Sequence, residues 1–193
     1  GTAYGNEVTF TTPPPCDATV TDFDGNVYDV VNIFGYCWTK SNLKTSHYKD
    51  GTVIPQSLNG NDFFSGTSLT GTWCNFDYNS ANDAIYGKLY NWATVNHPAG
   101  LCPNGWHVST ETDWQRNIYY LGNNHAGDKK AVSPLWNAPN SGATNLTGFT
   151  GLPGGMLVGD INISGFQALG TGAIFWTSDE SPTNSSKAMT HPL

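Results

Sequence analysis

The residue types in this chain that could do chemistry are four cysteines, five histidines and scattered carboxylates. The cysteines are widely spaced, and no two of them form the short-spaced pair that is typical of a zinc site. Their even number favours two disulfide bonds in an oxidising compartment. Four cysteines allow three pairings, and four buried free thiols are the alternative. The disulfide candidates are Cys16, Cys37, Cys74 and Cys102.

The histidines and serines lack a sequence context that supports nucleophilic catalysis. No Gly-x-Ser-x-Gly segment is present, and His107 stands between Trp106 and Val108 at the expected start of a buried strand. We interpret His107 as a hydrogen-bonded structural residue. Glycoside cleavage needs two carboxylates, one of them in an apolar pocket. The glutamates offer no such pair, and we predict that the protein is not an enzyme; they are Glu7, Glu111 and Glu180.

One cluster of oxygen-bearing side chains precedes an expected helix. Hard cations prefer carboxylate and amide oxygens, so the cluster is a candidate calcium site, although the chain requires no cofactor. The alternative is that these side chains cap the helix and shape the loop, with Asp83 as the N-cap. The cluster consists of Asp77, Asn79, Asn82 and Asp83.

The composition limits the partners of this chain. Charged residues make up 12% of the sequence, aromatic residues make up 13%, and the net charge is −7. These values are typical of a polar, turn-rich extracellular domain, and the aromatic side chains need a core in which to be buried. The acidic surface repels nucleic-acid phosphates, so we expect no nucleic-acid binding. No apolar run reaches the roughly 18–20 residues of a membrane span.

Two segments are predicted to be a hairpin and a helix. Residues 19–33 alternate apolar and polar side chains around Asp24-Gly25-Asn26, which predicts a hairpin with a type I′ turn rather than part of a calcium loop. Ile85, Leu89, Trp92 and Ala93 fall on one helical face, and they predict about three turns of helix that end at Pro98 and Gly100.

A second helix is predicted to begin after Ser109 or Thr110. Trp114, Ile118 and Leu121 would line its inner face, and Gly122 would stop it. Residues 123–151 are expected to form a long loop, and residues 151–159, 161–169 and 173–178 are expected to form short strands. The fold class is therefore α+β. Residues 1–15 are interpreted as the last strand of a preceding immunoglobulin- or fibronectin-III-like domain followed by a proline linker.

Six ordered segments between residues 19 and 181 resemble the Fibrobacter succinogenes major paralogous domain, or FISUMP. They are TVTDFDGNVYDVVNI, CWTKSNLKTSHYKDGTVIP, NDAIYGKLYNWATVN, GLCPNGWHVSTETDW, WNAPNSGATNLTGFTGLPGG and FWTSDES. The resemblance implies membership in the C-type-lectin-like superfamily, on the branch of the formylglycine-generating enzymes. It implies two helices flanking a small, twisted, mostly antiparallel sheet with long loops, and an origin in a Bacteroidetes- or Fibrobacter-type bacterium.

The chain also departs from this pattern. Family members usually continue through one or two more strands and close with a cysteine, so residues 16–193 would form the domain without its usual C-terminal strand. The pairing of Cys102 and of Cys16 therefore stays open. One branch of the superfamily oxidises cysteine with a copper-binding cysteine pair, and the cysteines of this chain do not resemble that pair.

The resemblance implies a secreted or cell-surface module for recognition or adhesion, without catalysis. Its ligand would be a glycan or another surface polymer, because lectin-like folds bind through long loops and aromatic faces suit sugar rings. The alternative is a structural subunit of an extracellular filament or surface assembly built from copies of itself. Neighbouring immunoglobulin- or fibronectin-like domains are expected partners. The candidate ligand-binding aromatics are Phe63, Phe64, Trp73, Tyr78 and Trp136.

Overall fold

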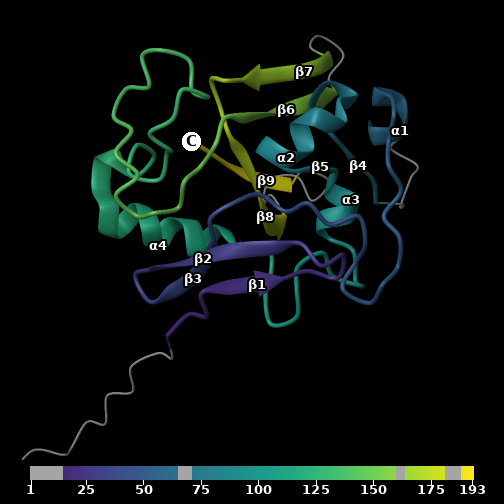
Figure 1. Ribbon diagram of the computed structural model, residues 1–193, viewed down its shortest axis with the longest axis horizontal. Helices are drawn as coiled ribbons and strands as arrows, with labels where there is room; N and C mark the ends of the chain where they lie inside the picture. The colour runs from purple at the N-terminus through teal and green to yellow at the C-terminus, as the bar shows by residue number, and fades with distance from the viewer. Residues whose placement is uncertain (1–14, 65–70, 160–163, 181–187) are drawn as a thin grey trace, which may run out of the picture.

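The computed structural model describes residues 15–64, 71–159, 164–180 and 188–193 (Figure 1). The predicted N-terminal strand and most of the proline linker lie outside the described residues. The protein is α+β, with small antiparallel sheets and short helices. The strands are β1 (Thr19–Thr21), β2 (Val27–Ile33), β3 (Tyr36–Thr39), β4 (Trp73–Cys74), β5 (Leu89–Tyr90), β6 (Gly154–Gly159), β7 (Ser164–Leu169), β8 (Ile174–Glu180) and β9 (Ala188–Pro192).

These strands form four separate small sheets within the described ranges, in place of the single sheet that the resemblance implies. β2 lies between β1 and β3, and the other strands pair as β4–β5, β6–β7 and β8–β9. The helices are α1 (Gly60–Phe64), α2 (Asp83–Tyr86), α3 (Trp92–Val95) and α4 (Glu111–Leu121), with 3-10 turns at Phe76–Tyr78, Ser80–Asn82 and Gly122–Asn124. Only α4 among them is longer than five residues.

The predicted hairpin at residues 19–33 is present, but its turn is not of type I′. Asp22 accepts a bond from the Gly25 amide (3.1 Å), and the Asp22 amide donates to Asn26 (3.0 Å). Gly25 has a positive φ of 83°, and neither Asp24 nor Asn26 does. A type I′ turn needs two such residues, so this turn is a three-residue loop closed by a glycine bulge.

The prediction of one continuous helix around Ile85 to Ala93 is wrong, because the helical conformation ends at Gly87. Gly87 has a φ of 72°, and a Cβ there would lie 2.7 Å from the carbonyl oxygen of Leu43. The next amide, that of Lys88, donates to the same oxygen at 3.0 Å. Leu89–Tyr90 is consequently extended and pairs with β4, and helix resumes only in α3. The hydrogen bond to Leu43 and the pairing with β4 therefore outweigh the helical pattern of the apolar residues.

The prediction for α4 is confirmed. Thr110 is the N-cap, and it forms a capping box in which its hydroxyl accepts from the Asp113 amide and the Asp113 carboxylate accepts from the Thr110 amide. Gly122 follows the helix with a φ of 65°. Trp114 is 1% exposed and packs with Ile33 and Phe149 in one part of the core.

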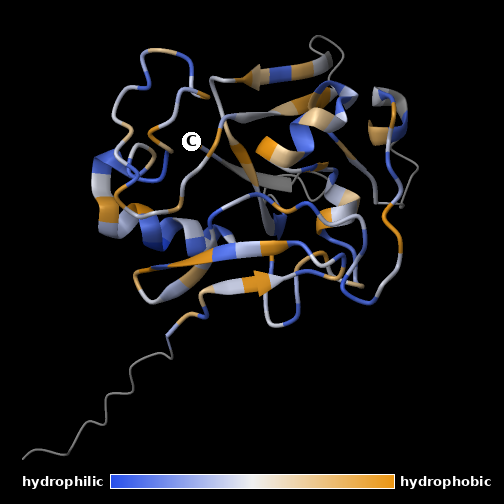
Figure 2. Ribbon diagram, in the orientation of Figure 1, coloured by the Kyte–Doolittle hydropathy of each residue, from blue (hydrophilic) through white to orange (hydrophobic). Residues whose placement is uncertain are grey.

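The strands of the C-terminal third complete the core. β6, β7 and β8 occupy the segments predicted for them, and β9 is an additional strand that pairs with β8. Hydrophobic colours on β2 and β8 contrast with the mostly hydrophilic colours of α4 and of the surrounding loops (Figure 2). A second core cluster lies around Tyr48, Ile54 and Tyr90.

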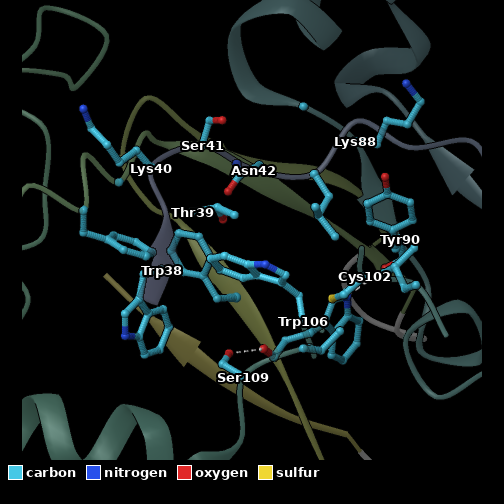
Figure 3. A pocket seen from close by; sticks show the side chains of 18 of the residues that line it. Trp38, Thr39, Lys40, Ser41, Asn42, Lys88, Tyr90, Cys102, Trp106 and Ser109 are labelled. Atoms are coloured by element: carbon cyan, nitrogen blue, oxygen red, sulfur yellow. Dashed lines mark hydrogen bonds between the residues drawn. The ribbon is translucent and has the colours of Figure 1, made fainter. Parts of the chain in front are cut away.

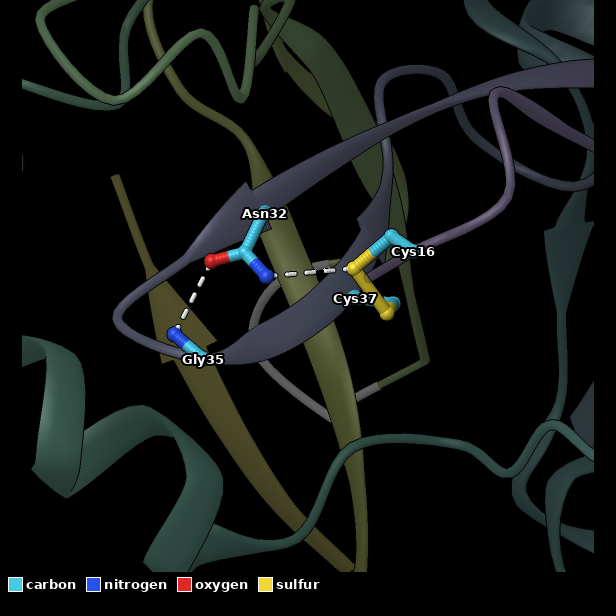
Figure 4. Close-up of a disulfide and its surroundings, with 4 residues drawn as sticks. All are labelled: Cys16, Asn32, Gly35 and Cys37. Atoms are coloured by element: carbon cyan, nitrogen blue, oxygen red, sulfur yellow. Dashed lines mark hydrogen bonds between the residues drawn. A yellow bond between two sulfur atoms is a disulfide. The ribbon is translucent and has the colours of Figure 1, made fainter. Parts of the chain in front are cut away.

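The structure contains one disulfide bond in place of the two that were predicted. Cys16 is bonded to Cys37, and the Asn32 amide lies 3.3 Å from the Cys16 sulfur (Figure 4). Cys74 and Cys102 are both buried free thiols. Cys74 pairs with Leu89 in the β4–β5 ladder, and Cys102 lies in the loop that follows α3. The pairing therefore ties the start of the domain to β3.

Candidate functional site

An exposed aromatic cluster lies where the β2–β3 turn meets α4. We call it the aromatic platform and define it by Phe34, Tyr36, Tyr119 and Tyr120. Phe34 lies in the β2–β3 turn and Tyr36 at the start of β3. Tyr119 and Tyr120 lie in the last turn of α4. Tyr119 is 82% exposed, Tyr120 is 60% exposed and Phe34 is 46% exposed. Ring faces that are this open can contact a ligand without any rearrangement of the core.

Phe34, Tyr120 and Tyr119 form a chain of ring contacts, and Arg116 of α4 lies over the ring of Tyr36. The ring centroids of Phe34 and Tyr120 are 4.7 Å apart with an angle of 32° between the planes. Tyr119 and Tyr120 meet edge to face at 5.3 Å. The guanidinium of Arg116 lies 4.8 Å from the Tyr36 ring centroid and 3.5 Å from the Asp113 carboxylate. The turn and the helix thus present one aromatic surface, and the charge of Arg116 beside it is balanced by Asp113.

Phe34 occupies a backbone conformation that is unfavourable for its side chain. Phe34 and Gly35 have φ values of 52° and 88°, and they connect Ile33 to Tyr36 in a two-residue turn. Such type I′ turns favour asparagine at the first position, since a bulky residue at positive φ costs roughly 1–2 kcal/mol. An exposed phenylalanine here is unfavourable for the backbone and for solvation alike. Residues held in this way cluster at functional sites.

A cleft of about 820 Å³ adjoins the platform, and Tyr36 belongs to both. Its lining combines β3 and the segment after it with α2–β5, residues 101–109, β6 and β8. Figure 3 shows Thr39, Ser41 and Asn42 along one side and Ser109 on the opposite side. Trp38, Trp106 and Trp176 are among the aromatic side chains of the lining. The volume lies within the range of ligand pockets.

Several polar groups of the cleft form hydrogen bonds within the protein. The Ser109 hydroxyl donates to the Trp176 carbonyl (3.3 Å), and the Trp176 indole donates to the Tyr90 carbonyl (2.8 Å). The Asn42 amide donates to the Tyr86 carbonyl at 2.8 Å. These bonds fix the aromatic walls in place.

The titratable groups near the cleft are poorly suited to catalysis. Burial raises the pKa of the Cys102 thiol to about 12, and it does the same for Cys74, so neither is a ready nucleophile. His107 is exposed, and its Nε2 lies 3.2 Å from Asp113 Oδ2. Burial alone would raise the pKa of Asp113, but hydrogen bonds from Thr110 and the contact with His107 lower it. Asp113 thus serves the capping box as well as the histidine.

The structure does not bring the five predicted ligand-binding aromatics together. Phe63 and Trp136 are buried, with 6% and 4% exposure, and Phe63 lines the cleft. Trp73 donates to the Ile54 carbonyl and lies under the Lys88 ammonium. Phe64 is 40% exposed, and Tyr78 packs edge to face on Phe166. None of the five belongs to the aromatic platform.

The predicted calcium residues are close in sequence, and several of their polar groups are occupied. Asp83 accepts two bonds from the Lys88 ammonium, at 3.0 and 3.1 Å. Asn79 accepts from the Ala81 amide and caps the 3-10 turn Ser80–Asn82, and the Asn82 amide donates to the Phe76 carbonyl. The N-cap of α2 is Asn82, and Asp83 is the first residue of that helix. Asp77 is exposed, with a φ of 55°.

Two absences hold for the described parts of the chain. No group of three or more histidine, cysteine, aspartate or glutamate side chains in those ranges is placed to hold a metal ion. In the same ranges, none of the helices is long and apolar enough to cross a bilayer.

The platform residues were missed in the sequence, although a signal for them exists. The predicted inner face of α4, with Trp114, Ile118 and Leu121, leaves Tyr119 and Tyr120 on the outer side, because successive helical residues are about 100° apart. Phe34 next to Gly35 sits between two strand-like segments, where a polar turn residue is expected. Aromatic residues at positions that favour polar ones are the sign of a surface site.

The comparisons identify the family of this chain. The family model described as the Fibrobacter succinogenes major domain matches residues 31–191. A search of curated proteins and a search of solved structures each found no match. The matched region covers most of the chain, and the protein belongs to this family.

Proposed function

We propose that this member of the Fibrobacter succinogenes major domain family is a non-catalytic recognition module. It acts as an adhesin on the cell surface or in secreted form, and it binds a glycan or another surface polymer. The aromatic platform is the contact surface. Its open tyrosine faces suit the apolar faces of sugar rings, and Arg116 and the tyrosine hydroxyls supply hydrogen-bond donors at the edge.

The observation that carries this proposal is the conformation and exposure of Phe34. A phenylalanine with a φ of 52° and 46% exposure is unfavourable for stability on two counts. A role in which the ring is presented to a ligand accounts for both. The contact with Tyr120 holds the ring in a fixed orientation, which lowers the entropy lost on binding.

Other features support the remaining parts of the proposal. The Cys16–Cys37 disulfide suits an extracellular compartment. The high pKa of the Cys102 and Cys74 thiols suits a protein without thiol chemistry. The α+β fold with long loops suits the C-type-lectin-like superfamily, which we propose as its wider group. Neighbouring immunoglobulin- or fibronectin-like domains of the same protein would hold the module at a distance from the cell surface.

Binding to a panel of polysaccharides tests the proposal. Wild-type protein and the Tyr119→Ala and Tyr120→Ala variants are incubated with cellulose, chitin, xylan and a glycan array. Phe64→Ala is the matched control, because Phe64 is a partly exposed phenylalanine outside the platform. We expect each tyrosine variant to lose about tenfold in affinity while Phe64→Ala binds normally. Absence of binding by the folded wild type, or a loss confined to Phe64→Ala, would count against the platform.

A structural subunit of a surface assembly is the second candidate function. The cleft favours it, because a cleft of about 820 Å³ can receive a segment of another component of the assembly. Size-exclusion chromatography and electron microscopy separate the two functions. Ordered self-association without polysaccharide binding would support the assembly role, and a monomer that binds polysaccharide would support recognition.

A further inference from the structure

The edge of β3 that faces away from β2 is open. The Lys40 amide donates to the Asp29 carbonyl at 2.8 Å, so these opposite residues form a hydrogen-bonded pair. Bonded and non-bonded pairs alternate along an antiparallel ladder. The amide and carbonyl groups of Thr39 and Cys37 must therefore point away from β2.

These outward groups have no backbone partner within the part of the chain that the structure describes. Thr39 and Cys37 both line the cleft of about 820 Å³. An unpaired strand edge is a template for another strand, and proteins normally cover or blunt such edges. β3 carries neither a proline nor a lysine within its four residues, and Lys40 follows directly after them.

The opposite side of the cleft includes a backbone segment that belongs to no helix or strand. The Ser178 amide donates to the Ser109 carbonyl at 2.9 Å, which places the segment that ends at Ser109 beside β8. Among the described residues, His107 and Val108 make no backbone-to-backbone hydrogen bond. Both residues line the cleft. The cleft is thus bounded by two stretches of backbone with free hydrogen-bonding groups.

The side chains that line the cleft suit a bound segment whose inward face is uncharged and apolar. Trp38 and Trp106 line it. Both lysines of the lining have an acidic neighbour, because Lys88 pairs with Asp83 and Lys40 lies 3.8 Å from Asp29. Asp17 is an exposed acidic residue of the lining. The residues of a bound segment that face the tryptophans should therefore be neutral and apolar.

We propose that the cleft is a docking slot for a single extended strand of a different polypeptide, which adds to the Thr39 edge of β3. Main-chain hydrogen bonds supply the affinity, and apolar side chains at alternate positions pack on the tryptophans. A polypeptide suits this cleft better than a glycan does, because the free groups are amides and carbonyls repeated along a strand. All the described strands are already paired in their own sheets, so a folded second copy offers no single strand from them. Tyr36 belongs to the aromatic platform and also lines the cleft, so the slot adjoins the platform.

Titration with a synthetic peptide tests the proposal. The probe is an acetylated and amidated heptapeptide of alternating threonine and valine, and the readout is the fluorescence of the cleft tryptophans. The matched control peptide has the same sequence with every second amide N-methylated, which removes the donors on one edge. We expect saturable binding of the first peptide and at least about tenfold weaker binding of the second.

Two protein variants locate the binding. Thr39→Pro removes an outward amide of β3, and Thr21→Pro removes an amide on the outer edge of β1. Thr21 is the residue of β1 that does not line the cleft, whereas Thr19 and Val20 do. Circular dichroism confirms that both variants are folded. Thr39→Pro should lose about tenfold in peptide affinity, and Thr21→Pro should bind as the wild type does.

A second readout reports on the cleft directly. Cys102 lines the cleft, and its buried thiol should be alkylated slowly. In a Cys74→Ala background the bound peptide should slow this alkylation further. Equal affinity for both peptides, or an unchanged affinity in Thr39→Pro, would overturn the proposal. If the wild type self-associates and Thr39→Pro abolishes this self-association, the occupant is a second copy of the chain. That result would overturn the assignment to a different polypeptide.

Discussion

Phe34 stacks on Tyr120 with ring centroids 4.7 Å apart, although the backbone of Phe34 has a φ of 52°. The contact contributes roughly 0.5–1.5 kcal/mol, and the positive φ costs roughly 1–2 kcal/mol. Asparagine accepts this conformation more readily and is the preferred residue at the first turn position. We therefore expect Phe34→Asn to be as stable as the wild type or about 1 kcal/mol more stable, measured by urea denaturation. A loss of more than about 2 kcal/mol would mean that Phe34 is a core residue.

The disulfide is expected to be a major source of stability. Cys16 and Cys37 are 21 positions apart, and closing a loop of that length contributes about 3 kcal/mol in the chain-entropy model. The Cys16→Ser/Cys37→Ser double variant should lose this amount in urea denaturation. Thiol titration of the unfolded protein provides the control: two thiols should react without a reductant and four with one. Four reactive thiols before reduction would contradict the pairing.

Lys129 is a buried lysine whose ammonium lacks a hydrogen-bond partner within the described residues. The ammonium lies 5.4 Å from the Trp114 ring. Burial lowers the pKa of Lys129 to about 8, against an unfolded value near 10.5. The unfolded chain therefore binds more protons between these values, and this group makes stability rise with pH from about 8 to 10.5.

The Lys129→Met variant isolates this contribution. It keeps an unbranched apolar side chain and removes the charge, so it should be more stable than the wild type by a few kcal/mol below pH 8. The difference should shrink as the pH rises to 10.5. Urea denaturation of both proteins across this range measures it. A difference that stays constant with pH would show that the ammonium is not the cause.

The calcium prediction is tested by thermal unfolding with and without the ion. Asp83 is already paired with Lys88, and the Asn82 amide is used within the loop. We expect chelator and millimolar Ca²⁺ to leave Tm unchanged, because a resident ion would need these groups. A rise in Tm that Asp77→Asn abolishes would instead place a calcium ion in this loop.

Local signals in the sequence predict the local structure well. The position of the turn near Gly25, the N-cap at Thr110 and the stop at Gly122 each depend on residues within a few positions of one another. Their geometry follows from φ preferences and side-chain caps, which act whatever the rest of the chain does. The type of the turn and the capping box with Asp113 were not predicted.

Long-range contacts account for what the sequence did not predict. The break at Gly87 depends on the Leu43 carbonyl, 44 positions earlier, and no helical pattern carries that information. Cys16 bonds to Cys37 because the fold places β3 close to Cys16. Cys74 is instead enclosed in the β4–β5 ladder. The platform likewise forms only when α4 packs beside the β2–β3 turn.

The affinity of Phe34→Asn for a polysaccharide that the wild type retains is the most direct measurement of the recognition role. This substitution keeps the turn and removes only the ring that the turn presents. Isothermal titration of the two proteins should show affinity at least about tenfold weaker for the variant, with stability equal to or above that of the wild type. Equal affinity in the two proteins would contradict the role assigned to the platform.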